Sequence, residues 1–342
     1  MTNDEIQMTK ECPMTNIELR MITAVQPNLT HRFSFRHSSF VLPPAFDIRL
    51  LTFVILLLIQ PPTFAQDMPL SQVLVNSAGW ELVADGFRYA EGPAVDAEGT
   101  LYFTDSLSDR IYRLEASGKP KVFVKQSGGT KGMMFGPDGW LFGCQAGKRR
   151  IVAFDKEGKE STIVEGVEPN DLVVNRTGAI YFTEPMQRRV WHVSPRGDAR
   201  IVDVGLGYPN GLTLWPDQGT LVVADMLGSY LWAFRIEPDG ALAFKQPYYP
   251  VHCPAARIDS GADGMTVDAA GRLYVATHLG VQMFDPTGRL SGVIRTPPDV
   301  PVTNVILAGP KLDTLYITCV DRIYRRKTKT TGILFFGTTE KK

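Results

Sequence analysis

Short apolar runs alternate with polar turns along most of the chain, and residues 208–234 show this pattern most clearly. Three apolar segments, at 212–215, 221–224 and 230–234, are separated by turn sequences that contain Pro, Asp, Gly and Ser. Short runs with β-branched and aromatic side chains, bounded by such turns, are typical of antiparallel strands. The stretch therefore predicts three consecutive strands, with Asn210 at the head of the first one.

The same module recurs along the chain and predicts the architecture of the fold. Its copies begin at Glu91, Lys131, Asn170, Asn210, Asp263 and Thr303, so that successive copies are 40, 39, 40, 53 and 40 residues apart. A period of roughly 40–50 residues is that of a four-stranded propeller blade. The sequence therefore predicts an all-β fold, a six-bladed β-propeller. The long fourth interval, which holds the sequence PYYP at 247–250, is expected to contain an inserted loop.

Composition fits one large β domain over residues 66–342. The chain has 31 Gly and 24 Pro among 342 residues, more than the roughly 12% of average usage, and frequent chain reversals need that excess. No helical periodicity is evident after residue 66. The net charge is zero, which excludes bulk attraction to nucleic acid. None of the four cysteines shows CxxC spacing, so a zinc or redox site is not expected, although Cys253 and Cys319 could pair in an oxidising compartment.

Residues 1–65 are expected to be an N-terminal extension that ends in a signal peptide. The apolar run at 50–59 follows Arg49 and is too short to span a membrane. The residues after it suggest cleavage near Ala65, which predicts a periplasmic or secreted protein. Residues 1–45 do not resemble the start of a signal peptide, so translation from a later start site is a hypothesis. A buried strand is the alternative for the apolar run.

The first residues of the copies predict a site at the centre of the fold. Because inner strands run along a central channel, these residues share one depth around its axis, and four of the six carry carboxylate or amide oxygens. Such an oxygen-only set suits calcium, magnesium or manganese. Two carboxylates at one centre repel each other unless a cation lies between them. The alternative is that each dipeptide, such as Asn210-Gly211, only makes a turn.

At these residues the sequence resembles the senescence marker protein (regucalcin), gluconolactonase and lactonase family of six-bladed propellers, over residues 80–330. The resemblance is carried by Glu91-Gly92-Pro93, Pro169-Asn170-Asp171, Pro209-Asn210-Gly211 and Asp263-Gly264-Met265, in this order and repeat phase. It implies that Glu91, Asn210 and Asp263 bind a divalent cation and that Asn170 lies beside it, contacting metal, water or substrate. Calcium is expected first, with magnesium, manganese and zinc as alternatives.

The resemblance also implies a small lactone, or a similar ester, as the substrate, with Asp263 as the acid/base residue. The sequence has no GxSxG, HExxH or P-loop motif that would indicate another hydrolase chemistry. Some members of the family have a substrate-binding arginine shortly before the position of Asn170. This chain has Glu165, Glu168 and Pro169 there, so specificity for aldonolactones is an open question.

Two further residues are candidates for substrate contact. Lys131 belongs to the ring of first positions, where a cation is unfavourable beside a metal, so we expect it to reach the channel mouth and bind a sugar carboxylate or hydroxyl. Glu184, just after a predicted second strand, is the other candidate. For both, exposure on the surface is an equal alternative.

Other functions stay open at this level. Related propellers hydrolyse phosphotriesters with a similar ring of oxygen ligands. A non-catalytic propeller that binds a protein or glycan is also compatible with the sequence, because a fold alone does not determine function. Metal-dependent hydrolysis of sugar lactones is the function that the motifs favour.

Overall fold

The computed structural model describes residues 68–297 and 301–336. All described residues belong to one compact unit. The predicted signal peptide lies outside the described residues. In the part of the chain that the structure describes, no helix is long and apolar enough to cross a membrane.

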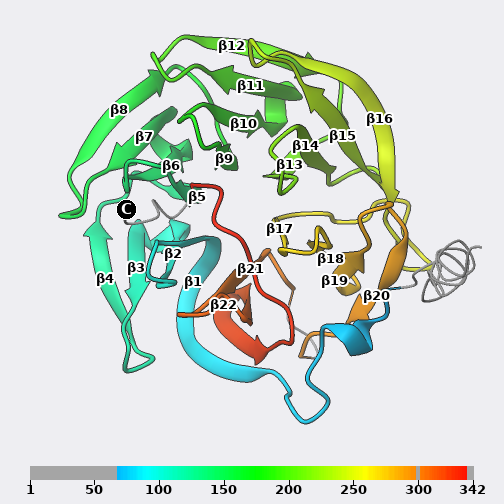
Figure 1. The fold of residues 1–342 in the computed structure, drawn as a ribbon. Coiled ribbons are helices and arrows are strands. Elements are labelled where there is room, and N and C mark those ends of the chain that lie inside the picture. The colour runs from blue at the N-terminus through cyan, green and yellow to red at the C-terminus, as the bar shows by residue number, and fades with distance from the viewer. Residues whose placement is uncertain (1–67, 298–300, 337–342) are drawn as a thin grey trace, which may run out of the picture. The chain divides into compact units, whose positions relative to one another are not determined.

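The described residues form five antiparallel sheets around a common centre (Figure 1), which confirms the prediction of an all-β propeller. Four of the sheets have four strands each. These strands are β5 (Thr130–Phe135), β6 (Leu141–Gln145), β7 (Arg150–Phe154) and β8 (Glu160–Glu165); β9 (Leu172–Val174), β10 (Ile180–Glu184), β11 (Arg189–Val193) and β12 (Ala199–Val204); β13 (Pro209–Leu214), β14 (Thr220–Asp225), β15 (Tyr230–Ile236) and β16 (Leu242–Pro250); and β17 (Met265–Val267), β18 (Leu273–Thr277), β19 (Gly280–Phe284) and β20 (Leu290–Ile294).

The fifth sheet joins the first and the last predicted copies. Its strands, in spatial order, are β21 (Asn304–Ala308), β22 (Thr314–Lys327), β1 (Glu81–Val95), β2 (Leu101–Asp105), β3 (Arg110–Leu114) and β4 (Pro120–Lys125). The repeat predicts six blades, whereas the structure has five hydrogen-bonded sheets. The reason is the long strand β1, which pairs with β22 through its first half and with β2 through its second half. One strand therefore links the two ends of the domain.

Six strands, one from each predicted copy, surround the centre. Around it follow β1, β5, β9, β13, β17 and β21, each beside the next (Figure 1). Their backbones lie so close that some positions allow no side chain. A Cβ on Gly211 would overlap the carbonyl oxygen of Asp263, and one on Gly92 would overlap the carbonyl oxygen of Lys131. At these two positions glycine is thus a packing requirement of the inner strands.

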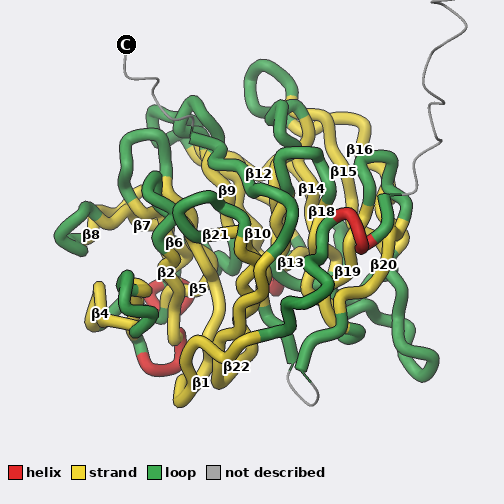
Figure 2. The backbone as a smooth tube through the Cα atoms, turned by 60° about the horizontal axis from the view of Figure 1, so that its bottom comes forward, coloured by secondary structure: helices red, strands yellow, loops and turns green. Residues whose placement is uncertain are grey.

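Helical structure in the described range is limited to four single turns, seen as short red segments in Figure 2. They are the 3-10 helices η1 (Leu70–Gln72), η2 (Ser106–Ser108), η3 (Ala146–Lys148) and η4 (Pro185–Gln187). Three of them occupy the same place in successive copies, between the second and third strands, and each ends at a residue with left-handed φ: Asp109, Arg149 and Arg188. They shape the turns next to the candidate site.

The long interval before Asp263 contains the expected loop, but the sequence PYYP is not part of it. The sequence PYYP at 247–250 ends strand β16 and pairs with β15, whereas the following residues up to Asp263 form the loop. Proline is tolerated there because β16 is the outermost strand of its sheet. Tyr249 also favours a strand, since its ring is buried, packs 5.3 Å from that of Phe284, and its hydroxyl accepts a hydrogen bond from Trp215. Apolar burial thus outweighs the turn tendency of the two prolines.

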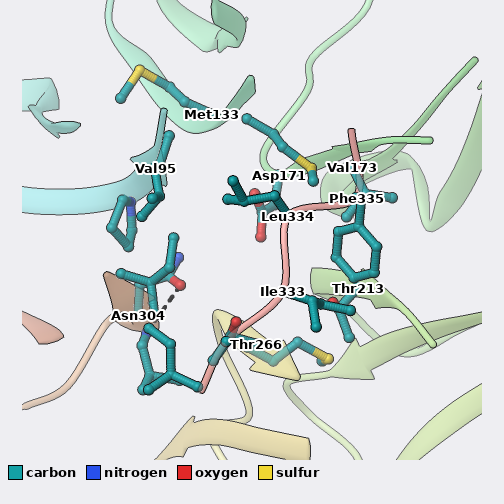
Figure 3. A pocket seen from close by; sticks show the side chains of 18 of the residues that line it. Val95, Met133, Asp171, Val173, Thr213, Thr266, Asn304, Ile333, Leu334 and Phe335 are labelled. Atoms are coloured by element: carbon teal, nitrogen blue, oxygen red, sulfur yellow. Dashed lines mark hydrogen bonds between the residues drawn. The ribbon is translucent and has the colours of Figure 1, made fainter. Parts of the chain in front are cut away.

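The C-terminal segment 331–336 crosses one end of the centre (Figure 1). Turns from three copies hold it through hydrogen bonds from Ala269 N to Thr331 O, from Gly332 N to Leu312 O and from Gln218 Nε2 to Phe335 O, each 2.8 Å long. Between this segment and the six inner strands lies a cavity of about 80 Å³ (Figure 3). The segment therefore lies across the far end of the channel.

The cysteines form no disulfide among the described residues. Cys253 lies half-buried in the inserted loop, while Cys319 is fully buried in β22, and both are free thiols. The pairing considered from the sequence is therefore absent.

The close approach of the inner strands can be tested at Gly211. Because its missing Cβ leaves room for the Asp263 carbonyl, we expect Gly211→Ala to lower the free energy of unfolding by about 1–3 kcal/mol. Urea unfolding measures this loss. Gly79→Ala is the matched control, since nothing lies within 4 Å of the Cβ there. Equal stability of the two variants would show that the strands can move apart at no cost.

Candidate active site

The structure brings the first residues of five copies together at the open end of the channel. Asn210 lies in β13, and Asp263 is two residues before β17, while the backbone at Gly211 packs against Asp263. Glu91 lies in β1, and its charge interacts with those of Lys131 and Asp263. We refer to Glu91, Lys131, Asn170, Asn210 and Asp263 as the ring.

Hydrogen bonds connect three members of the ring in sequence. Lys131 Nζ donates to Asn170 Oδ1 at 3.1 Å, and Asn170 Nδ2 donates to Asn210 Oδ1. Asn210 Nδ2 in turn lies 3.5 Å from the sulfur of Met226. Residues that are about 40 positions apart in the sequence thus touch directly. Lys131 reaches inward to Asn170.

The two ring carboxylates lie in a protein environment that disfavours their charge. Burial raises the pKa of Glu91, while the Lys131 ammonium and a 2.6 Å hydrogen bond from Ser106 Oγ act in the opposite direction. Burial also raises the pKa of Asp263 well above its usual range, and the charges of Glu91 and Asp171 add to the effect. Two carboxylates that oppose each other's ionisation favour a cation between them.

An open cleft gives access to Asp263. It is lined by Tyr89 and Met226 beside Asp263, and by His278 and Arg295 further out. Burial, followed by the charges of Asp263 and Glu91, raises the pKa of the Tyr89 phenol to about 12. Tyr89 therefore stays a neutral hydroxyl at physiological pH and can donate a hydrogen bond to a bound molecule.

The sixth first-position residue does not belong to the ring. Thr303 is buried, and its hydroxyl donates to the backbone oxygens of Ala90 and Thr318, at 2.9 and 3.1 Å. Thr303 thereby connects strands of the last copy and the first copy.

Glu184, which we expected to contact substrate, has a structural role instead. Its carboxylate is buried and accepts hydrogen bonds from Glu168 N and Trp191 Nε1, both at 2.9 Å. Asp105 and Asp225 do the same in their copies, where each accepts bonds from the backbone just before the ring residue. Glu184 therefore fixes the segment that leads to Asn170 and does not point into the cleft.

Sequence reasoning missed Asp171, which lies directly behind the ring. Its side chain faces the closed cavity together with Asn304, among mostly apolar residues (Figure 3). Burial raises the pKa of Asp171 to about 7, and the charge of Glu91 adds to this effect. A signal was present in the sequence: the second residue of each copy is Gly in four copies, and Asp171 and Asn304 are the two exceptions.

The donor set of the ring suits a hard divalent cation. Glu91 and Asp263 supply two carboxylates, Asn170 and Asn210 supply amide oxygens, and Lys131 balances only one of the two charges. Calcium and magnesium prefer oxygen ligands of these kinds. Within residues 68–297 and 301–336, no group of three or more His, Cys, Asp or Glu side chains is arranged to hold a metal, so any cation here also depends on the amides.

Comparison with known proteins finds a matching family and similar proteins that are named as lactonases. The family model described as SMP-30/Gluconolactonase/LRE-like region matches residues 89–321. A gluconolactonase of Zymomonas mobilis is 28% identical over 312 residues, covering 77% of this chain and 85% of that protein. The pentonolactonase XacC of Haloferax volcanii is 26% identical over 241 residues, covering 68% of this chain and 81% of that protein.

A similar solved structure is also described as that of a gluconolactonase. A structure described as a gluconolactonase from Xanthomonas campestris superimposes with a TM-score of 0.68 at 27% identity, covering 76% of this chain and 92% of that one.

The structural role of Glu184 predicts the outcome of Glu184→Gln. The amide cannot accept two N–H donors without turning its own NH₂ toward one of them, so we expect a loss of about 1–3 kcal/mol in unfolding free energy. Turnover and KM for a lactone should stay within about twofold, because the side chain does not reach the cleft. Thermal unfolding and initial rates measure the two effects. A large rise in KM without loss of stability would restore the substrate-binding role.

The raised pKa of Asp171 predicts how the free energy of unfolding depends on pH. Between its ordinary pKa of 3.8 and about 7, the folded protein holds a proton on Asp171 that the unfolded chain has lost. Stability therefore falls as pH rises through this window. Asn at this position mimics the protonated acid, so Asp171→Asn should weaken the fall between pH 5 and 8 and be more stable than the wild type at pH 8.

Urea unfolding in the presence of a chelator measures these slopes. Asp138→Asn, on an exposed turn where the carboxylate accepts a hydrogen bond from Trp140 N, is the control and should leave the slope unchanged. An Asp171→Asn slope equal to that of the wild type would contradict the assignment.

Proposed function

Because the chain belongs to the SMP-30/gluconolactonase/LRE-like family, we propose that it is a hydrolase that opens sugar lactones with the help of a divalent cation. The named relatives include a gluconolactonase and a pentonolactonase, which supports a five- or six-carbon sugar lactone as substrate. The observation that carries the proposal is the meeting of Glu91, Asn210 and Asp263 at the end of the channel that opens into the cleft.

Calcium is the cation that the donor set favours. Glu91, Asp263 and the two amides offer only oxygen ligands, whereas zinc sites are usually built with Cys or His. Magnesium and manganese share the preference for oxygen and are the next candidates. A bound divalent cation acts as a Lewis acid that polarises the lactone carbonyl.

Asp263 is the residue that we assign to proton transfer. It lines the cleft, so its carboxylate faces the space in which a water molecule would attack the substrate, and the bound cation would make that water easier to deprotonate. It takes a proton from the attacking water as the water oxygen bonds to the carbonyl carbon. When the bond from that carbon to the ring oxygen breaks, the proton passes to the ring oxygen, which becomes a hydroxyl group.

The neighbouring side chains position the substrate. Asn170 lines the same opening as Lys131 and Tyr208, and its amide can bind a hydroxyl group of a sugar. Tyr89 adds a neutral donor on the side of Asp263. Such convergent polar groups suit a polyhydroxylated ligand better than an alkyl lactone.

The proposal predicts calcium-dependent hydrolysis of glucono-1,5-lactone. Protein treated with EDTA should lose activity in a pH-stat assay and recover it when CaCl₂ is added. Asp263→Asn should lower kcat by about 10²–10⁴-fold, as is typical when a general base is removed. Circular dichroism checks that the variant is folded.

Asp217→Asn is the matched control, because Asp217 lies on an exposed turn of a neighbouring copy, where its carboxylate accepts a hydrogen bond from Gly219 N. It should retain full activity. Calcium binding without hydrolysis of any sugar lactone would favour a non-catalytic binding propeller instead. An active Asp263→Asn protein would remove Asp263 from the mechanism.

A further inference from the structure

Lys131 places an ammonium group among the oxygen donors of the ring. Its Nζ lies 3.1 Å from Asn170 Oδ1, one of the amide oxygens available to a cation. Its charge also acts on both carboxylates, since it lowers the pKa of Glu91 and that of Asp263 against the larger effect of burial. The chain thus provides a cation of its own at the place where a divalent ion is expected.

The ammonium also determines how the two ring amides are oriented. Because Lys131 has only N–H donors, Asn170 must turn its oxygen toward Lys131 and its NH₂ group toward Asn210. Asn210 then presents its oxygen to that NH₂ group. Both amide oxygens are therefore engaged by donors of the protein, and the bond from Lys131 holds this arrangement in place.

A second position is available to the ammonium. Lys131 also lines an opening to solvent together with Glu168, Asn170 and Tyr208. The side chain is only partly buried and has several rotatable bonds, so it can turn from Asn170 toward this opening, where Glu168 pairs with Arg149 at 3.2 Å. A substrate that reaches this opening would meet the ammonium there.

We propose that Lys131 competes with the divalent cation for Asn170 Oδ1, so that metal binding releases the ammonium into the opening that Lys131 and Asn170 share. The inference rests on the proposed metal-dependent function. It makes Lys131 a determinant of metal affinity and, when the metal is bound, a substrate contact. The effect on metal affinity is electrostatic, because a fixed positive charge next to a divalent ion weakens the binding of that ion.

Calcium affinity of the chelator-treated protein tests the inference without any lactone. Isothermal titration with CaCl₂ should give a Kd at least about tenfold lower for Lys131→Met than for the wild type, because the competing charge is gone. Lys131→Arg keeps the charge and should stay within about threefold of the wild type. Lys121→Met is the matched control, since Lys121 is exposed and pairs only with Glu115, at 3.6 Å. Its Kd should not change.

A folded-state check accompanies the titration, because Lys131→Met leaves two carboxylates without a counter-charge. If this variant is too unstable to titrate, saturating CaCl₂ should raise its Tm more than that of the wild type. An equal or smaller rise, or an unchanged or higher Kd, would overturn the competition. A Lys131→Arg protein that binds calcium as tightly as Lys131→Met would overturn it as well.

The kinetic readout tests the second half of the inference. At saturating calcium, Lys131→Met should have a KM for glucono-1,5-lactone several-fold above that of the wild type, and an unchanged KM would overturn the substrate contact. Calcium binding by the wild type without lactone hydrolysis would refute the proposed function alone, since the comparison of Kd values stands without it. Tight calcium binding and hydrolysis with equal Kd values would refute the competition alone.

Discussion

Mutual repulsion between Glu91 and Asp263 is the interaction on which the rest of the site depends. Each carboxylate is held by a separate inner strand, and the packing of those strands around one centre gives neither side chain a way to leave. The fold therefore keeps two like charges together at a cost in stability. A positive charge between the two carboxylates relieves this repulsion, and Lys131 supplies one such charge from within the chain.

Much of the fold and the ring was predictable because the repeat fixes both. A regular interval places the same position of each copy at the same depth, so Asn170 and Asn210, which are 40 residues apart, come into contact. The pairing between copies was harder to predict. Whether β1 forms one sheet with β22 depends on hydrogen bonds between residues more than 200 positions apart, and no local pattern reports them.

The sequence did not reveal the roles of Glu184 and Asp171, for two different reasons. Glu184 and Asp263 are both acidic residues next to apolar strands, and the sequence does not show which backbone N–H groups lie nearby. In the fold, Glu184 meets Glu168 N and Trp191 Nε1, whereas Asp263 meets other charges. Asp171 was missed for the opposite reason, because its neighbours in space, among them Glu91, come from other copies. Local sequence identifies the chemical group, and the tertiary structure decides its use.

The C-terminal segment 331–336 affects the route by which a ligand enters and leaves the site. Since it lies across the channel behind the ring, a ligand of Asp263 enters and leaves on the opposite side, where the cleft and the opening beside Lys131 lie. Under the proposed lactone hydrolysis, the acid that forms must leave on this same side before another lactone can take its place. Accumulated product would then slow the reaction, because it occupies the positions that the substrate needs.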